Sequence, residues 1–167
     1  IKEQKINLVK FNLDFHDINW LENFNLSNNK PAIIYANEFF DCFPIRQFYK
    51  KNNLWYEKKI LFNKKDQCLQ FNDTEITNIK TLNIINNYKS KGIIEISKSR
   101  EDYFKKICKH ISIAGGMILI IDYGFFDRPN YFTLQSLYNN KKTNILDNPG
   151  LQDITSLVDF NQLIIIA

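Results

Sequence analysis

The stretch from Ile33 to Pro44 constrains the fold of this chain more than any other. It begins with the apolar run Ile-Ile-Tyr-Ala and then stops abruptly at three polar residues, Asn37, Glu38 and Asp41. A strand that is nearly all apolar is usually covered on both faces, as in a parallel sheet between helices. Ligands in such sheets bind just beyond the carboxyl ends of the strands. The sequence therefore predicts a site where this strand ends.

A second strand of the same kind is expected at Met117–Ile121. It also ends on polar residues, Asp122 and Tyr123. Strands that both end in an acid and alternate with helices favour a mostly parallel α/β sheet. The carboxyl ends of the two strands would then form one edge, with Asp122 near Glu38 and Asp41. For Asp122, a place in the site and a simple turn with the following glycine both stay open.

The helix between these strands is marked by its ends and by one apolar face. Ser99 and Asp102 resemble a capping box at its start, and Gly115–Gly116 is typical of a helix end. Asp159 is expected to cap a last helix. The apolar face has helical spacing and consists of Phe104, Ile107, Cys108 and Ile111.

The middle of the chain reads differently. Three short segments, 45–51, 54–62 and 67–71, are rich in aromatic and β-branched residues and are separated by short polar turns. This spacing predicts an antiparallel β-meander over 45–71, either inserted into the domain or extending the edge of its sheet. Residues 76–88 are a candidate helix, and Gly92–Ser97 is a short strand.

Composition excludes several classes of function. The net charge of +4 is mild and the lysines are scattered, so no nucleic-acid partner is expected. The three cysteines are widely spaced, which favours neither a disulfide framework nor a metal site. No apolar run approaches the ~20 residues of a membrane span. A chain of 167 residues that starts at Ile1 without methionine is expected to be one partial domain, an internal fragment.

The stretch that opens at Asn37 also resembles a known family. Asn-Glu-Phe-Phe-Asp-Cys-Phe-Pro, followed by Ile-Arg-Gln-Phe up to Phe48, is similar to the hallmark of the MidA-like S-adenosylmethionine-dependent methyltransferases. Further matches follow in the same order along the chain. They are Trp55-Tyr56-Glu57, Gly92 to Ser97, Gly115 to Gly124, Thr133-Leu134-Gln135, Asn148-Pro149-Gly150, Asp153-Ile154-Thr155 and Val158-Asp159-Phe160.

The resemblance implies a fold, a cofactor and a partner. The fold would be a partial Rossmann-like class I methyltransferase sheet, and the cofactor S-adenosylmethionine. The family's glycine-rich cofactor turn would precede Ile1, so residues 1–167 would be a partial domain that lacks it and is nearly inactive alone. The family includes the enzyme that methylates an arginine of a respiratory complex I subunit. A protein substrate is therefore implied, in the mitochondrial matrix or the bacterial cytoplasm, and the oligomeric state is not predicted.

The candidate site residues are inferred from their positions at strand ends together with the family resemblance. Glu38, Asp41 and Asp122 are the predicted catalytic acids, because carboxylates grip a guanidinium through paired hydrogen bonds. For Glu38 and Asp41, one helix cap and one solvated side chain is the simpler alternative.

The cofactor is expected to contact Asp17, at the end of a short strand over 12–17, and Asn37. The predicted substrate-binding residues are Phe39, Phe40, Tyr123 and Gln135, although Phe39 and Phe40 would also suit the core.

A non-catalytic assembly factor that keeps the methyltransferase fold is the competing function. The meander at 45–71, with an exposed edge and aromatic residues, would then be its docking surface. An α/β hydrolase lacks support, because the chain has no Gly-x-Ser-x-Gly elbow.

Overall fold

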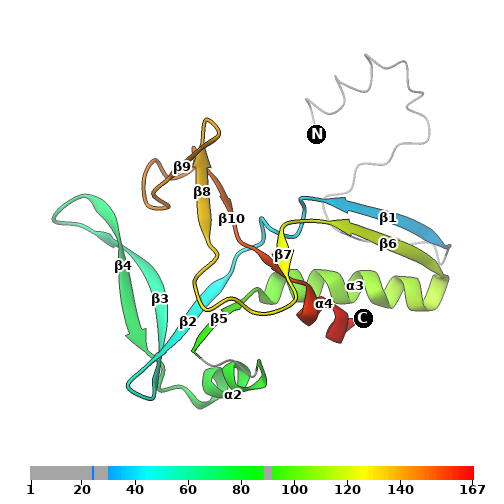
Figure 1. Cartoon of the computed structure of the whole chain (residues 1–167), viewed down its shortest axis with the longest axis horizontal. Helices are drawn as coiled ribbons and strands as arrows, with labels where there is room; N and C mark the ends of the chain where they lie inside the picture. Colours follow the sequence, from blue (N-terminus) through cyan, green and yellow to red (C-terminus); the bar gives the residue numbers. More distant parts are fainter. Residues whose placement is uncertain (1–23, 25–29, 89–91) are drawn as a thin grey trace.

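The computed structural model describes residue 24 and residues 30–88 and 92–167, and it shows a mixed α/β fold (Figure 1). The predicted strand over 12–17, with Asp17, lies outside the described residues. The helices are α2 (Ile79–Asn87), α3 (Lys98–Ala114) and α4 (Phe160–Ile166). The longer strands are β1 (Ala32–Asn37), β2 (Arg46–Lys51), β3 (Leu54–Asn63), β4 (Cys68–Glu75), β5 (Ile93–Ile96) and β6 (Gly116–Ile121). The shorter strands are β7 (Gly124–Phe125), β8 (Gln135–Tyr138), β9 (Lys141–Thr143), β10 (Asp153–Thr155) and β11 (Val158–Asp159).

The two predicted apolar strands, β1 and β6, pair in parallel. Their register runs from Ala32 opposite Gly116 to Asn37 opposite Ile121, so both strands end at the same edge. A side chain at Gly116 would be impossible, because its Cβ would lie 2.0 Å from the carbonyl oxygen of Ala32. The pairing confirms that the acids after β1 and β6 lie close together.

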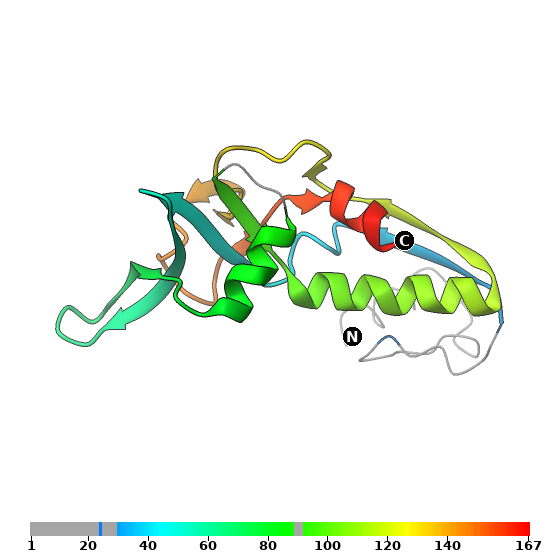
Figure 2. The same ribbon diagram turned by 90° about the horizontal axis from the view of Figure 1, so that it is seen from below.

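One face of this parallel pair packs against helices α3 and α4 (Figure 2). The buried core there consists of Ala36, Phe40, Phe104, Ile107, Val158 and Leu163. Cys108 and Ile111 pack against it, as the helical spacing predicted. The opposite face carries exposed apolar side chains, among them Ile33, Met117 and Leu119. Within the described part of the chain, the pair is covered on one face, not on the two that its apolar sequence predicted.

The predicted meander is present as β2, β3 and β4. These strands are antiparallel, and β5 joins them on the far side of β2, which gives the order β4-β3-β2-β5. Helix α2 packs against this sheet with Ile85 fully buried among Phe48, Ile94 and Ile96. The largest sheet in the described part of the chain is therefore antiparallel. The expected mostly parallel sheet appears only as the β1–β6 pair and the short β7–β11 pair.

A small fourth sheet in the described part of the chain has the order β10-β8-β9. No helix in the described ranges is both long enough and apolar enough to cross a membrane.

The start of α3 differs from its predicted position. Ser97, not Ser99, is the N-cap, and its Oγ accepts from the backbone N–H of Arg100 at 3.4 Å. The same hydroxyl donates to the carbonyl oxygen of Pro44 at 2.8 Å, whereas Ser99 is exposed. The predicted capping box at Ser99 is wrong, because Ser97, two residues earlier, is buried between the helix and the chain that enters β2. The predicted ends at Gly115 and Asp159 are confirmed.

Replacing each serine by alanine should show which of the two caps α3. We expect Ser97→Ala to lower the free energy of unfolding by about 1–2 kcal/mol, because it removes both a helix cap and a buried hydrogen bond. Ser99→Ala is the matched control and should change it by less than about 0.5 kcal/mol. Urea denaturation followed by circular dichroism measures both, and equal losses would contradict this assignment.

Candidate active site at the end of the parallel pair

The turn after β1 begins with a strained residue. Glu38 has φ of 44°, in the left-handed region that costs a residue other than glycine on the order of 1–3 kcal/mol. Its backbone N–H donates to the carbonyl oxygen of Ile121 at 2.8 Å, so the end of β6 holds it in place. The Glu38 side chain is exposed and has no hydrogen-bond partner among the described residues. Its carboxylate is thus presented at the strand end on a fixed backbone.

Asp122 fixes the rest of this turn. Its Oδ2 accepts from the backbone N–H groups of Phe40 at 2.9 Å and Asp41 at 3.2 Å, and its Oδ1 accepts from Tyr123 at 2.8 Å. A carboxylate that receives backbone N–H bonds at both oxygens is engaged in holding the chain. Asp122 therefore holds the turn in place, and its catalytic role stays a prediction.

Arg100 holds the same turn from the other side and was missed in the sequence. Its buried guanidinium donates to the carbonyl oxygens of Phe40 at 2.7 Å and Leu157 at 3.3 Å, and to the hydroxyl of Ser156 at 2.8 Å. Burial lowers its pKa, and the nearby carboxylates, Asp122 first among them, oppose that effect. A lone arginine early in a helix normally indicates a solvated face, so no sequence signal could have found this role.

Asp41 is the last residue of the turn and is only 8% exposed. Burial raises its pKa, and the negative charges of Asp122, Asp153 and Glu38 raise it further. The two predicted acids therefore differ: Glu38 faces solvent and Asp41 is enclosed. They do not project together from a helical turn, because the backbone of Glu38 is in the left-handed region.

Of the other residues predicted for this part of the site, three are exposed to solvent and one is buried. Asn37 is exposed, and its Oδ1 accepts from the hydroxyl of Tyr35 at 3.4 Å. Phe39 and Tyr123 are also exposed, at 37% and 62%. Phe40 is fully buried and packs edge-on against Phe104 at 5.9 Å between ring centroids. Phe40 is thus part of the core, the alternative that the sequence left open, and its contact with substrate stays a prediction.

Gln135 lies on β8 and pairs with Thr155, the residue before Ser156, whose backbone N–H donates to the carbonyl oxygen of Asp41. The Nε2 of Gln135 donates to the hydroxyl of Thr155 at 3.4 Å, across the β8–β10 pair. The nearby Glu95 is likewise engaged, since it accepts from Gln47 at 2.7 Å and from the backbone N–H of Thr133 at 2.9 Å. The contacts of Glu95 join β5 and β2 to the segment before β8, and the contact of Gln135 joins β8 to β10.

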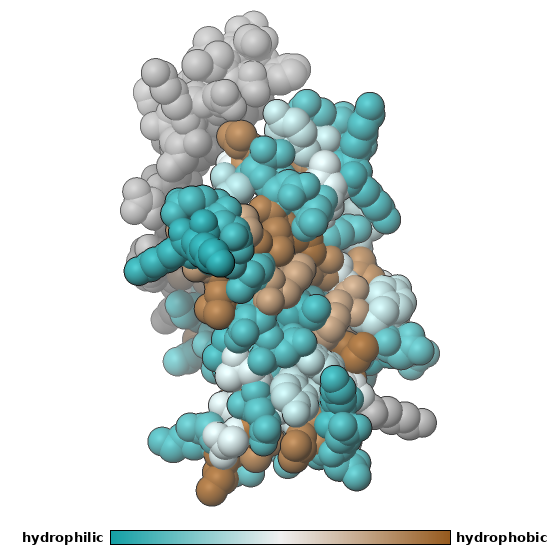
Figure 3. Space-filling model, turned by 90° about the vertical axis from the view of Figure 1, so that its left-hand side faces the viewer, coloured by the Kyte–Doolittle hydropathy of each residue, from teal (hydrophilic) through white to brown (hydrophobic). Residues whose placement is uncertain are grey.

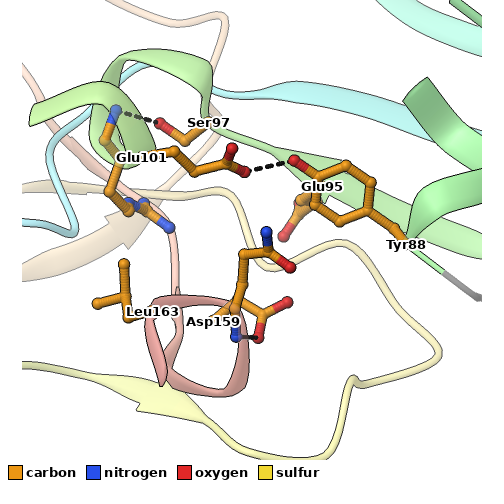
Figure 4. A pocket seen from close by; sticks show the side chains of 8 residues that line it. Tyr88, Glu95, Ser97, Glu101, Asp159 and Leu163 are labelled. Atoms are coloured by element: carbon orange, nitrogen blue, oxygen red, sulfur yellow. Dashed lines mark hydrogen bonds between the residues drawn. The ribbon is translucent and has the colours of Figure 1, made fainter. Parts of the chain in front are cut away.

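A second polar cluster lies between β5, α3 and α4 (Figure 4). Tyr88 donates to the buried Glu101, and its pKa is raised by burial and by that hydrogen bond. Arg128 pairs with Asp159 at 2.5 Å and donates to the carbonyl oxygen of Tyr88 at 2.6 Å. The cavity holds only about 20 Å³, enough for a water molecule and too small for a cofactor. These bonds join the end of α2 at Tyr88 to α3 and, through Arg128, to the start of α4 at Asp159.

Comparison with known proteins decides the family. The family model described as "Putative S-adenosyl-L-methionine-dependent methyltransferase" matches residues 1–167. The chain belongs to this methyltransferase family. Membership confirms the resemblance that the Asn37–Phe48 motif indicated.

Curated relatives carry one name. The chain is 30% identical over 150 residues to the protein arginine methyltransferase NDUFAF7 homologue, mitochondrial, of Caenorhabditis elegans, covering 88% of this chain and 35% of that protein. It is 29% identical over 133 residues to the mitochondrial protein arginine methyltransferase NDUFAF7 of Danio rerio, covering 79% and 31%. The chain thus spans about a third of the length of these relatives.

A solved structure shares the fold. It is a COG1565 superfamily member from Burkholderia thailandensis bound to S-adenosyl-homocysteine, with a TM-score of 0.76 and 18% identity. The match covers 97% of this chain and 43% of that one. The arrangement of helices and strands described above is therefore that of a larger methyltransferase fold.

Neutralising Asp122 tests its positioning role. We expect Asp122→Asn to lower the free energy of unfolding by about 2 kcal/mol, because an amide cannot accept from all of these N–H groups. The exposed Asp127→Asn is the matched control, with a change below about 0.5 kcal/mol. Thermal and urea unfolding measure both, and a fully stable Asp122→Asn protein would show that the contacts are dispensable.

The raised pKa of Asp41 predicts a pH effect with a defined sign. The folded protein binds a proton at the Asp41 carboxylate more tightly than the unfolded chain does. The ordinary pKa of this group is 3.8. Ionisation of Asp41 therefore costs folding free energy as pH rises above about 4. Asp41→Asn removes that cost, so its stability relative to the unaltered protein should rise as pH increases above about 4. Urea titrations at several pH values measure the difference, and a flat difference would contradict the raised pKa.

Proposed function

We propose that the protein containing this chain transfers a methyl group from S-adenosylmethionine to an arginine nitrogen of a protein, and that the turn at Asn37–Asp41 holds the acceptor. One observation carries the proposal. The carboxylate of Glu38 is exposed and unpartnered in the described structure, at the joint end of two parallel strands, on a strained backbone fixed by Ile121 and Asp122. Strain that the surroundings maintain in this way is typical of functional sites.

A guanidinium suits this turn chemically. Glu38 can accept two parallel N–H bonds from it, which fixes the plane of the acceptor and leaves one nitrogen to react. Asp41 lies close enough for its pKa to respond to the charge of Glu38. A cation bound at the turn would relieve the repulsion between these two acids and favour their ionised forms. Asp41 thus remains a proposed catalytic residue, acting through its charge at the end of the turn.

S-adenosylmethionine, when bound, supplies the electrophilic methyl group. Among the described residues, Asn37 suits a contact with it, because its amide is exposed where β1 ends and its nitrogen donates to no described side chain. Phe39 and Tyr123 are exposed beside the turn and suit the exclusion of water from the acceptor. We place the β1–β6 pair within a larger Rossmann-like sheet, with Asp17 and a glycine-rich turn as further parts of the cofactor site.

The relatives' names support the remaining details of the proposal. The curated proteins are called mitochondrial arginine methyltransferases, so we propose a protein substrate and a mitochondrial location for this protein too. The family resemblance makes a respiratory complex I subunit the proposed substrate. In a bacterial host the corresponding location would be the cytoplasm.

Substituting Glu38 tests the proposed clamp. In the intact protein, we expect Glu38→Gln to slow methyl transfer to arginine by on the order of a hundredfold, since an amide lacks the charge that pairs with a guanidinium. Glu75→Gln, an exposed site on β4, is the charge-matched control and should leave the rate unchanged. The assay follows labelled methyl groups from S-adenosylmethionine into protein arginine in a mitochondrial extract.

Two results would count against the proposal. An unchanged rate in Glu38→Gln would reject the guanidinium clamp while leaving the enzyme activity intact. Absence of S-adenosylmethionine binding to the folded, intact protein, measured by calorimetry, would reject the enzyme. The non-catalytic assembly factor would then be the better reading of the fold.

A further inference from the structure

Strand β3 is longer than the strand that pairs with one of its edges. β2 reaches along β3 only as far as the pair Gln47–Lys58, whereas β4 pairs with β3 up to Asn63. The stretch 59–63 of β3 therefore has a strand on one side only, in the part of the chain that the structure describes. Alternate backbone N–H and C=O groups of this stretch point to the open side.

The open edge has a structural cause. Pro44 has no backbone N–H for a sheet, and its carbonyl oxygen accepts from the hydroxyl of Ser97. The chain before Arg46 is thus tied to the start of α3 and cannot extend β2 along β3. The β3–β4 hairpin projects beyond the rest of its sheet as a result (Figure 1).

Two hollows lie beside the β3–β4 hairpin, and we treat them as the two parts of one groove. Its first part has a volume of about 390 Å³ and lies among Ile45, Arg46, Lys59, Ile60, Phe71 and Leu134. A second part of about 330 Å³ lies at the hairpin tip, between Phe62 and Leu69 on one side and Leu146 and Pro149 on the other. Figure 3, which views this end of the molecule, shows apolar surface exposed among polar side chains. We call these two parts together the hairpin groove.

The charges in the first part are mainly positive. Arg46 binds both carboxylate oxygens of Glu57, at 2.6 and 3.0 Å, and lowers its pKa, so this acid is already neutralised. Lys59 lies 3.5 Å from the same carboxylate with nearly half of its side chain exposed. Lys58 lies over the ring of Phe71 at 4.6 Å.

Asp73 faces Lys58 in register but is hydrogen-bonded to Tyr49. The cations lining the first part, Arg46, Lys58 and Lys59, thus outnumber its acid, Glu57.

We propose that the hairpin groove binds an acidic, extended segment of a partner protein, which adds as a strand to the open edge of β3 at 59–63. Main-chain hydrogen bonds to β3 would supply affinity. Alternate acidic side chains would meet Lys59 and Arg46, and the apolar side chains between them would cover Ile60 and Phe62. The inference rests on the proposed function only in taking that partner to be the protein substrate.

Binding of a defined peptide tests the groove. The probe is a fluorescein-labelled peptide of alternating Glu and Val, added to the intact protein without S-adenosylmethionine and followed by fluorescence anisotropy. We expect saturable binding, weakened about tenfold by Lys59→Glu through charge repulsion. Lys109→Glu, an exposed site on α3 with the same change in charge, should bind like the unaltered protein. A peptide with Lys in place of Glu, and one with methylated backbone nitrogens, should both bind more weakly.

The result that overturns the proposal is equally defined. Equal binding by Lys59→Glu and Lys109→Glu, or equal binding of the methylated peptide, would reject strand addition at β3. Slow amide hydrogen exchange across 59–63 in the free protein would show that the edge is already covered. Tighter binding of a poly-uridine oligonucleotide, lost in Lys59→Glu, would reassign the groove to nucleic acid. Peptide binding by an intact protein that does not bind S-adenosylmethionine in calorimetry would uphold the groove and reject the proposed enzyme.

Discussion

The carboxylate of Asp122 is the contact on which the strand-end turn depends. It lies directly after β6 and accepts backbone N–H groups from the turn that follows β1, so it joins two chain segments that are 81 and 82 residues apart. Parallel pairing of β1 and β6 brings the two segments to one edge but does not fix the path of the chain beyond it. Asp122 supplies that constraint at Phe40 and Asp41, while the carbonyl oxygen of Ile121 holds the backbone N–H of Glu38.

The backbone carbonyl groups of Phe40, Asp41 and Pro44 accept hydrogen bonds from another part of the fold. Arg100 donates to Phe40, the backbone N–H of Ser156 donates to Asp41 at 3.0 Å, and Ser97 donates to Pro44. Donors from the first turn of α3 and from the chain before β11 thus meet acceptors that a turn would otherwise leave open to solvent. Because buried carbonyl groups need such partners, the first turn of α3 sets the path from β1 into the antiparallel sheet.

Local patterns predicted much of this fold, whereas the site depended on contacts that have no local pattern. The apolar run of β1, the short turns around β3 and the spacing of Phe104 and Ile107 were sufficient to predict those elements, because periodicity reflects burial directly. Arg100 could not be found this way, since its partners are carbonyl groups brought close only by the tertiary fold. Ser99 was preferred to Ser97 because the sequence does not show which hydroxyl is buried against Pro44.

The turn at Asn37–Asp41 and the hairpin groove are adjacent in the chain. Their order along the chain would set how a bound substrate is oriented. Ile45 and Arg46, which line the groove, follow Pro44 at the end of the clamped segment. A partner strand added to β3 would therefore end beside the chain that leads back to Asp41 and Glu38. An extended segment advances about 3.3 Å per residue, so a few residues beyond the groove would carry an arginine several ångströms toward the turn. Docking and chemistry would then use two surfaces, one a free strand edge and the other a turn fixed on both sides.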